Sequence, residues 1–406
     1  MLTTVNIKEK PMNKEKIKWI HAMKGIACLI VFFHHFFLTF YKATYTGNPA
    51  DSKTVSGIDT TFAVQPYGII LNGHFAVCLF IILSAFLFAG KIMKARQQEK
   101  EIDFLNLCAR RYFRLMLPVA YVGILIFLVK HILALINPAL PPYPFELTLP
   151  ELLSEVLIFQ WITLGGKISG VLWTMEILFW GALLAAGLAL FSTKKRWYMP
   201  FLYLLISYPM EHFFHYNFNI ILGVILADLF YYDRIGQYVD FFRSKKLDLS
   251  FVKGRKFRNI CGSLIVLMGL LIASYPYAAI PTNPVHIFFM KAFGVFFPLS
   301  SMGATHGFGV FVLCAGLLIR TENKILSSKP FEKLGNLSMG IYLQHGTIMA
   351  LLEILLFEKM FAHFENYHVA VAVIFLIAFT LVLLTAWLYH KFIEKNIDRL
   401  VNKIHL

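Results

Sequence analysis

Long apolar stretches, separated by short polar connections, run along most of this 406-residue chain. A helix needs about 20 mostly apolar residues to cross a bilayer core, and ten stretches approach that length. The pattern therefore predicts an all-α, polytopic membrane helix bundle of about ten transmembrane helices. The predicted spans are residues 19–40, 68–90, 115–136, 170–191, 197–212, 215–232, 259–280, 303–320, 337–357 and 368–390.

Two segments depart from this simple pattern of crossings. Residues 284–301 are apolar enough to cross, but a further crossing would place the basic connection 320–333 on the wrong side of the membrane. We therefore predict a re-entrant or interfacial segment near 284–301. The span at 197–212 is short and contains Pro209, which predicts a tilted or broken helix.

Composition and charge support a membrane protein. Hydrophobic residues make up 58% of the chain and charged residues 15%, far less charge than a soluble domain of this size carries. Of the 38 Lys and Arg residues, 31 fall in the tails and in those connections that a cytoplasmic N-terminus places inside. This asymmetry follows the positive-inside rule and predicts that both termini are cytoplasmic. The net charge of +15 then faces membrane lipids, and no nucleic-acid partner is expected.

The chain is expected to form a single transmembrane unit, without a cleavable signal peptide or a separate soluble domain. We predict a cytoplasmic N-terminal tail at 1–18, a transmembrane domain at 19–390 and a cytoplasmic C-terminal tail at 391–406. The cysteines lack the spacing of metal ligands, so neither a metal site nor a disulfide framework is predicted. They are Cys28, Cys78, Cys108, Cys261 and Cys314.

Two ionisable residues, Lys24 and His35, interrupt the first apolar stretch. Their spacing places them within roughly 20° of the same helix face and about 16 Å apart along the axis. Ionisable groups are costly inside a membrane and usually mark a cavity or a site. We therefore predict that both side chains point into one groove, which joins one membrane face to the opposite leaflet.

Other polar side chains fall within or beside the predicted spans. An imidazole suits the transfer of a proton from a hydroxyl, and a carboxylate can orient that imidazole. Arginine side chains bind phosphates bidentately. The candidates of these three kinds are His34, His35, His74 and His345, Glu176, and Arg110, Arg111 and Arg114.

Each candidate also has a structural interpretation. A histidine between helices often bonds a backbone carbonyl, and arginines at a helix end anchor to lipid phosphates. Intramembrane Lys, His and Glu residues also fit a proton-coupled transporter of a small anionic or sugar-linked solute. The chain lacks the repeat symmetry and the paired broken helices of many such transporters. A lipid-regulated sensor with basic loops is a third hypothesis.

Several dispersed motifs resemble the acyltransferase-3 family of integral membrane O-acyltransferases. The first span of that family has a basic residue followed eleven positions later by a histidine, as Lys24 and His35 are spaced here. Its second span is similar to GHFAVCLFIILSAFL in this chain. The RxxR pattern before its third span is matched by Arg111 and Arg114.

Two later motifs extend the resemblance over most of the chain. LWTMEILFW is similar to a Trp, Glu and aromatic pattern of the family, and LGNLSMGIYLQHG to its glycine, serine and YL-x-H segment. Two positions depart from the family: Lys24 stands where arginine is usual, and Ala85 where glycine is usual. No fused extracytoplasmic domain is expected after the last span. The matching residues are Trp173, Glu176, Phe179, Trp180, Gly335, Ser338, Tyr342 and His345.

The resemblance implies an O-acetyltransferase of the cell membrane. Such an enzyme moves an acyl group, most simply acetyl, from cytoplasmic acyl-CoA to a hydroxyl of a cell-surface or lipid-linked carbohydrate. Acetyl-CoA is the expected co-substrate, a carbohydrate or glycolipid the expected acceptor, and no metal is implied.

The resemblance also suggests roles for individual residues. His35 is the expected general base or transient acyl acceptor, and Glu176 or His345 orients it. Lys24 stabilises negative charge on the donor. The expected ligands of the coenzyme A phosphates are Arg111 and Arg114, with Arg110 beside them. Residues expected to contact the acceptor are His34, His74, Trp173, Ser338 and Tyr342, and the outer connections 41–67 and 137–168 are expected to shape a sugar site.

Overall fold

The structure is a computed structural model that describes residues 17–136, 148–162, 168–213, 216–245, 252, 254–296 and 301–404. Helices account for most of these residues, and the described part of the chain contains no strand. The all-α prediction is therefore confirmed.

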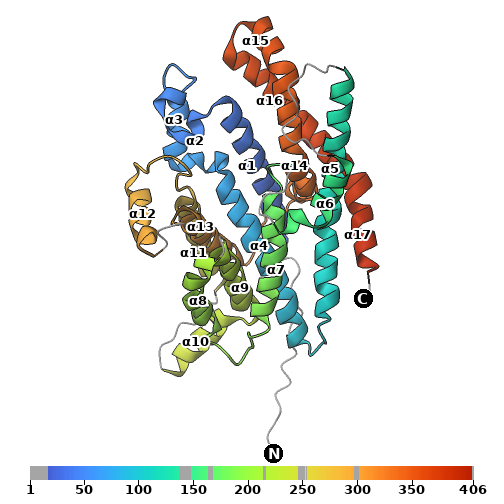
Figure 1. The fold of residues 1–406 in the computed structure, drawn as a ribbon. Helices are drawn as coiled ribbons and strands as arrows, with labels where there is room; N and C mark the ends of the chain where they lie inside the picture. Colours follow the sequence, from blue (N-terminus) through green and yellow to red (C-terminus); the bar gives the residue numbers. More distant parts are fainter. Residues whose placement is uncertain are drawn as a thin grey trace, which may run out of the picture.

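Each of the ten predicted apolar stretches forms a helix (Figure 1). Prolines lie inside two of them, Pro118 and Pro209, without ending either helix. In chain order the ten are α1 (Trp19–Phe40), α4 (Gly73–Gln97), α5 (Phe104–Ile136), α7 (Trp173–Ala189), α8 (Met199–Phe213), α9 (Asn217–Tyr231), α11 (Arg255–Ala273), α13 (Ser301–Ile319), α14 (Lys329–Leu352) and α16 (Tyr367–Tyr389).

Seven helical segments of the described chain are long and apolar enough to cross a membrane. Five of them are α1, α4, α5, α11 and α13. The other two are Lys329–Phe364, which begins with α14, and Tyr367–Asn402, which begins with α16.

The three remaining predicted spans are shorter helices. α7, α8 and α9 have 17, 15 and 15 residues, equivalent to about 25 Å of helix at most. A bilayer core is about 30 Å thick. The count of ten crossings therefore stays a prediction.

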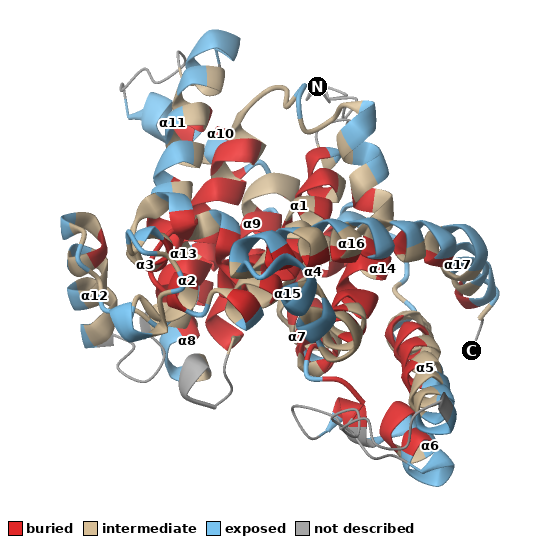
Figure 2. Cartoon of the chain, turned by 90° about the horizontal axis from the view of Figure 1, so that it is seen from above, coloured by how far each residue is buried: buried red, intermediate tan, exposed pale blue. Residues whose placement is uncertain are grey.

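The segment near 284–301 contains a separate short helix. α12 (Pro284–Phe296) has 13 residues, which is about 20 Å of helix. It packs beside α13 at the edge of the molecule (Figures 1 and 2). This length falls short of a bilayer core of about 30 Å, and the re-entrant or interfacial placement of this segment stays a prediction. Residues 297–300 lie outside the described part.

Residues 43–71 fold into a cap of short helices at the end of the bundle where α1 ends (Figure 1). Gly47 and Gly57 both have a φ of 65°, a conformation that glycine adopts without steric cost. The Asn48 side chain caps the second short helix by accepting a hydrogen bond from the Ala50 amide. The cap comprises α2 (Ala43–Thr46), η2 (Pro49–Asp51), α3 (Ile58–Val64) and η3 (Pro66–Leu71).

The backbones of α1 and α14 approach each other closely. A Cβ atom added at Gly25 would lie 2.7 Å from the carbonyl carbon of Leu334. One turn further along, the Cys28 thiol donates to the carbonyl oxygen of Ser338 over 2.9 Å. This contact aligns the polar face of α1 with the glycine, serine and histidine motif of α14.

The most buried part of the bundle lies around α1, α4, α9 and α14 (Figure 2). α4 packs on α9, and α11 packs on α13. At the edge, α5 contacts α6 (Leu149–Leu157) and α17 (Lys395–Asn402). The predicted C-terminal tail at 391–406 is therefore mostly helical, because η7 (His390–Glu394) and α17 continue from α16.

Candidate active site

The structure brings two of the four predicted catalytic residues together. His35 on α1 lies beside His345 on α14, with ring centroids 5.0 Å apart. Nε2 of His345 is 3.3 Å from Nδ1 of His35. His345 is fully buried, whereas His35 is only half-buried. The two residues are separated by 310 positions in the sequence, and the close packing of α1 on α14 joins them.

Backbone carbonyls define which ring nitrogens carry protons in this pair. Nδ1 of His345 lies 2.8 Å from the carbonyl oxygen of Tyr342, and Nδ1 of His35 lies 2.9 Å from that of Val31. A carbonyl oxygen only accepts, so in the neutral rings both Nδ1 atoms are donors. Nε2 of His345 is then an acceptor that shares the single Nδ1–H of His35 with the nearer Val31 carbonyl. Nε2 of His35 keeps its lone pair and is the atom suited to accept a proton.

Lys24 lies at the other end of the same face of α1, about 16 Å from His35 along the axis. The cationic groups that act on its ammonium are Arg111, Lys91 and Arg114. Lys91 lies near the end of α4, and the two arginines lie near the beginning of α5. Lys24 therefore belongs to a basic cluster rather than to the imidazole pair.

Arg111 points into the helix bundle. Its Nη2 donates to the Ser84 hydroxyl over 2.8 Å and to the Leu178 carbonyl over 2.7 Å. Its guanidinium carbon also lies 5.4 Å from the ring centroid of Phe88. The Nε–H is buried without a hydrogen-bond partner, which costs about 1–3 kcal/mol if nothing else fills the position. Arg111 therefore keeps a donor for a ligand.

Arg110 and Arg114 face a different part of the chain. Arg110 Nε and Nη2 donate to the Ile404 carbonyl over 3.0 and 2.9 Å. Arg114 pairs with Asp398 over 3.3 Å, with both side chains about half exposed. Arg110 and Arg114 are four positions apart and share one helix face, whereas Arg111 is rotated by about 100° from Arg110 and by about 60° from Arg114. The contacts thus distinguish Arg111, which bonds groups inside the bundle, from Arg110 and Arg114, which bond the C-terminal segment.

Glu176 does not join the imidazole pair. It is buried at 4% exposure and lines a cavity of about 420 Å³ with Trp180 and Asn217. None of the hydrogen bonds or ring contacts of His35 and His345 involves this carboxylate. Of the two partners that the sequence suggested for His35, His345 is therefore the one that contacts it.

Tyr342 and Ser338 support the site from α14. The Tyr342 hydroxyl bonds Thr174 over 2.5 Å and the Val171 carbonyl, so it ties α14 to the beginning of α7. The Ser338 carbonyl accepts from Cys28. Both contacts hold the helices that carry His35 and His345.

His74 and Trp173 belong to a second, buried network. His74 Nδ1 lies 2.9 Å from His306 Nδ1, and His74 Nε2 lies 3.0 Å from the Tyr216 hydroxyl. His306 Nε2 in turn donates to the Tyr275 carbonyl over 2.7 Å. Trp173 meets this network through its ring, 5.7 Å from that of Tyr216.

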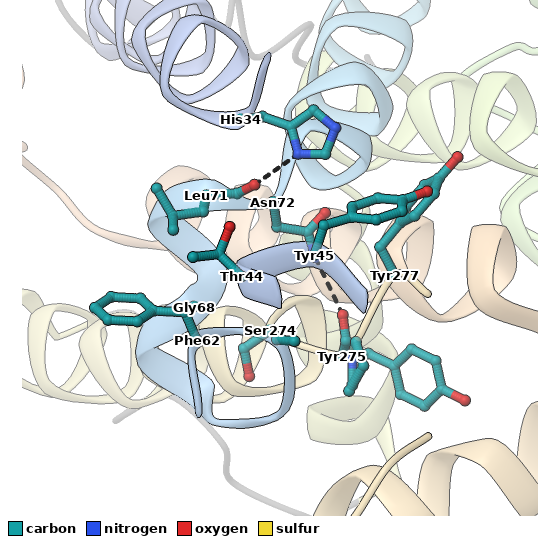
Figure 3. Close-up of a pocket in the computed structure, with 12 residues that line it drawn as sticks. His34, Thr44, Tyr45, Phe62, Gly68, Leu71, Asn72, Ser274, Tyr275 and Tyr277 are labelled. Atoms are coloured by element: carbon teal, nitrogen blue, oxygen red, sulfur yellow. Dashed lines mark hydrogen bonds between the residues drawn. The ribbon is translucent and has the colours of Figure 1, made fainter. Parts of the chain in front are cut away.

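His34 lies between the imidazole pair and the cap. Its ring is 5.1 Å from that of His35, and its Nδ1 donates to the Leu71 carbonyl over 2.8 Å. Figure 3 shows His34 at the edge of a hollow with Tyr45 and Tyr277 beside it. The enclosed space is about 20 Å³, enough for about one water molecule or one hydroxyl group. Part of the predicted sugar-binding connection 41–67 therefore does meet the site.

Sequence reasoning missed Lys91, Tyr277 and the pairing of His306 with His74. The position of Lys91 at the end of a span is explained by topology alone. His306 and Tyr277 carry no motif and are joined to the site only by the docking of α13 and its neighbours. Residues 137–147 and 163–167 of the second predicted sugar-binding connection lie outside the described residues.

The described residues contain no group of three or more His, Cys, Asp or Glu side chains that could hold a metal ion. The polar groups instead form an imidazole pair and a basic cluster within a bundle of apolar helices. This arrangement defines an integral membrane protein with charged groups in its interior.

A family model described as an acyltransferase domain matches residues 17–390, nearly the whole chain. The protein belongs to this acyltransferase-3 family, and is a membrane acyltransferase that takes an acyl donor and an acceptor. No curated protein and no solved structure matches the chain.

Proposed function

We propose that this protein is an O-acetyltransferase of the cytoplasmic membrane, which moves an acetyl group from cytoplasmic acetyl-CoA to a hydroxyl of a cell-surface or lipid-linked carbohydrate. The observation that carries the proposal is the His35–His345 pair. It leaves one imidazole nitrogen of a half-buried histidine as a proton acceptor beside the centre of the bundle.

In the proposed reaction, Nε2 of His35 takes the proton of the acceptor hydroxyl as the oxygen attacks the thioester carbonyl carbon. A C–O bond forms and the C–S bond breaks. The thiolate of coenzyme A leaves, and the proton held on His35 neutralises it. His345 accepts a hydrogen bond from the Nδ1–H of His35, which orients the ring and stabilises its protonated form.

The donor enters from the end of the bundle that holds Lys24 and Arg111. Within the part of the chain that the structure describes, no carboxylate is among the charged neighbours of either cation, which supports binding of an anionic group there. The axial separation of about 16 Å between Lys24 and His35 leaves room for an extended arm between the phosphates and the thioester.

The acceptor approaches from the side of the cap. The hollow beside His34 is lined by aromatic rings and by polar atoms of Thr44 and Asn72, a mixture suited to a single hydroxyl group of a sugar. Because His34 contacts His35, a hydroxyl entering past His34 reaches the proposed base.

The test is acyl transfer from labelled acetyl-CoA to candidate glycans by the purified protein, with mass spectrometry of the products. We expect His35→Ala to lower kcat by about 10²- to 10⁴-fold. The matched control is His131→Ala, because His131 is an exposed histidine of α5 outside the site. Wild-type rates in His35→Ala would disprove the mechanism, and solute flux in proteoliposomes without an acyl donor would favour a transporter.

His345 has a separate test as a positioning residue. His345→Leu should lower kcat less than His35→Ala and leave KM for acetyl-CoA within about twofold, because it removes an acceptor that orients the base. It should also displace the acidic limb of the pH–rate profile to lower pH, since the protonated base loses a stabilising partner. An unchanged profile would mean that His345 only packs.

A further inference from the structure

The basic cluster contains a residue that no motif of the sequence assigned, Lys91. Its Nζ atom lies 5.1 Å from the ring centroid of Phe88, and the guanidinium carbon of Arg111 lies 5.4 Å from the same centroid. Phe88 is only 5% exposed. A lysine of α4, itself exposed, and an arginine of α5 therefore both lie against one buried ring.

Like charges surround this place. The groups that act on Lys91 are Arg114, Arg111 and Arg110, and those on Lys24 include Arg111 and Lys91. Across the described residues, no carboxylate forms an ion pair with Lys24, Lys91 or Arg111. Three cations held together without a counter-charge repel one another, and an anionic ligand relieves that repulsion.

A second, independent observation points to a ligand. The buried Nε–H of Arg111 has no hydrogen-bond partner, although its Nη2 bonds Ser84 and Leu178. The Nε–H of Arg114 is likewise buried without a partner among the described residues, but its terminal nitrogen pairs with Asp398, and Arg110 bonds the Ile404 carbonyl. The cations of the cluster that the C-terminal segment does not engage are thus Lys24, Lys91 and Arg111.

We propose that Lys91, with Lys24 and Arg111, binds the phosphate monoester of the coenzyme A donor. This inference rests on the proposed function for the identity of the donor. A phosphate monoester carries nearly two negative charges and three acceptor oxygens, so it matches several cations and a spare N–H better than a phosphodiester does. The same chemistry would also attract an anionic lipid headgroup, and the test separates the two sources.

The experiment measures calorimetric affinity for coenzyme A and for dephospho-coenzyme A in nanodiscs of zwitterionic lipid. Lys91→Ala should weaken coenzyme A binding about tenfold and change dephospho-coenzyme A binding less than twofold. Lys91→Arg should retain most of the affinity. Lys94→Ala is the matched control, because Lys94 is an exposed lysine one turn further along α4, and it should behave as wild type.

Unchanged coenzyme A affinity in Lys91→Ala, or equal losses for both ligands, would overturn the inference. So would loss of bound phosphatidylglycerol, added to the nanodiscs, without loss of coenzyme A affinity, because the cluster would then serve a lipid. Acetyl transfer at saturating donor keeps the two proposals distinguishable. If the wild type transfers acetyl and Lys91→Ala binds coenzyme A normally, only this inference fails; if Lys91 governs coenzyme A binding but no acetyl is transferred, only the proposed function fails.

Discussion

Two arginines buried in this bundle have opposite surroundings. Arg234 is 0% exposed, and its Nε donates to Asp228 over 2.6 Å. Its two terminal nitrogens donate to the carbonyl oxygens of Lys194 and Thr193, to the Gln237 side chain and again to Asp228. Arg111 instead has two hydrogen bonds through one nitrogen, a buried N–H without a partner and cations as its charged neighbours.

The difference separates a structural cation from a binding cation. A buried charge whose donors are all used contributes to the folded state and has nothing left for a ligand. A charge with an unused donor and no counter-ion costs free energy in the isolated protein, and that cost is recovered when an anion binds. The predictions below test this contrast, from the largest expected effect to the smallest.

Of the variants considered, Arg234→Ala should lower the free energy of unfolding the most. It leaves the Asp228 carboxylate buried without its counter-charge, and breaking such a pair costs about 3–5 kcal/mol. Thermal unfolding in detergent measures the loss, and the fraction that stays folded should bind acetyl-CoA normally. Arg243→Ala is the control, because this exposed arginine lies in the same helix, α10 (Arg234–Ser244). A small change in the unfolding midpoint would show that the ion pair is not structural.

Arg111→Ala should weaken donor binding strongly and change the free energy of unfolding little. Loss of a charge-assisted contact with a phosphate costs about 1.5–3 kcal/mol, so KM for acetyl-CoA should rise about 10- to 100-fold with little change in kcat. Stability should fall by only about 1 kcal/mol, because the hydrogen bonds to Ser84 and Leu178 are lost together with an uncompensated charge. Arg111→Lys keeps the cation and should recover part of the affinity. An unchanged KM with a collapse in stability would place Arg111 in the same class as Arg234.

Periodicity in the sequence predicted the residues of α1 that belong to the site, but not their contact partners on other helices. The apolar stretches predicted the helices. Because Lys24 and His35 belong to one helix, their spacing also predicted that they share a face of α1. The partners on other helices could not follow from periodicity. His345 came from the resemblance to a family, and its contact with His35 depends on the close packing of α1 on α14 at Gly25 and its neighbours.

The arginines show a second reason why the sequence could not predict the whole site. Arg110, Arg111 and Arg114 were predicted together because they are close in sequence, although a helix rotates Arg111 by about 100° from Arg110 and the three side chains bond different parts of the chain. Which face points inward depends on how α5 docks, and the contacts of Arg110 and Arg114 depend on a C-terminal segment almost 300 residues away. Neither is encoded in a local pattern.

Asp59 in the cap is a third kind of buried charge, because hydrogen bonds rather than a counter-ion stabilise its carboxylate. Its carboxylate accepts from the Ser52 hydroxyl over 2.6 Å, the Lys53 amide over 2.8 Å and the Thr54 hydroxyl over 2.8 Å. Asp59→Asn should therefore destabilise the cap by about 1–3 kcal/mol near neutral pH. The measurement is the difference in unfolding midpoint between wild type and variant.

The pH dependence of that difference has a defined sign. Burial acts to raise the pKa of Asp59, but the hydrogen bonds from Ser52, Lys53 and Thr54 outweigh it and hold the pKa below the ordinary 3.8. A carboxyl group with a lowered pKa stabilises the folded state above its unfolded pKa, and this contribution disappears as the pH falls through the folded value. The gap between wild type and Asp59→Asn should thus close below about pH 4. A gap that widened in acid would contradict the assignment.

Arg110→Ala should have the smallest effect and is the sharpest test of the contrast within α5. Its side chain donates hydrogen bonds to the carbonyl oxygens of Ile404 and Asn402. Such partly exposed contacts contribute about 1 kcal/mol or less to the free energy of unfolding. Removal should loosen α17 and speed tryptic cleavage at Arg399, while KM for acetyl-CoA stays within about twofold. Arg111→Ala, measured beside it, should show the opposite pattern. If Arg110→Ala raised KM as much as Arg111→Ala does, the C-terminal segment would have to leave when the donor binds, and the arginines of α5 would form one phosphate site, as the sequence alone suggested.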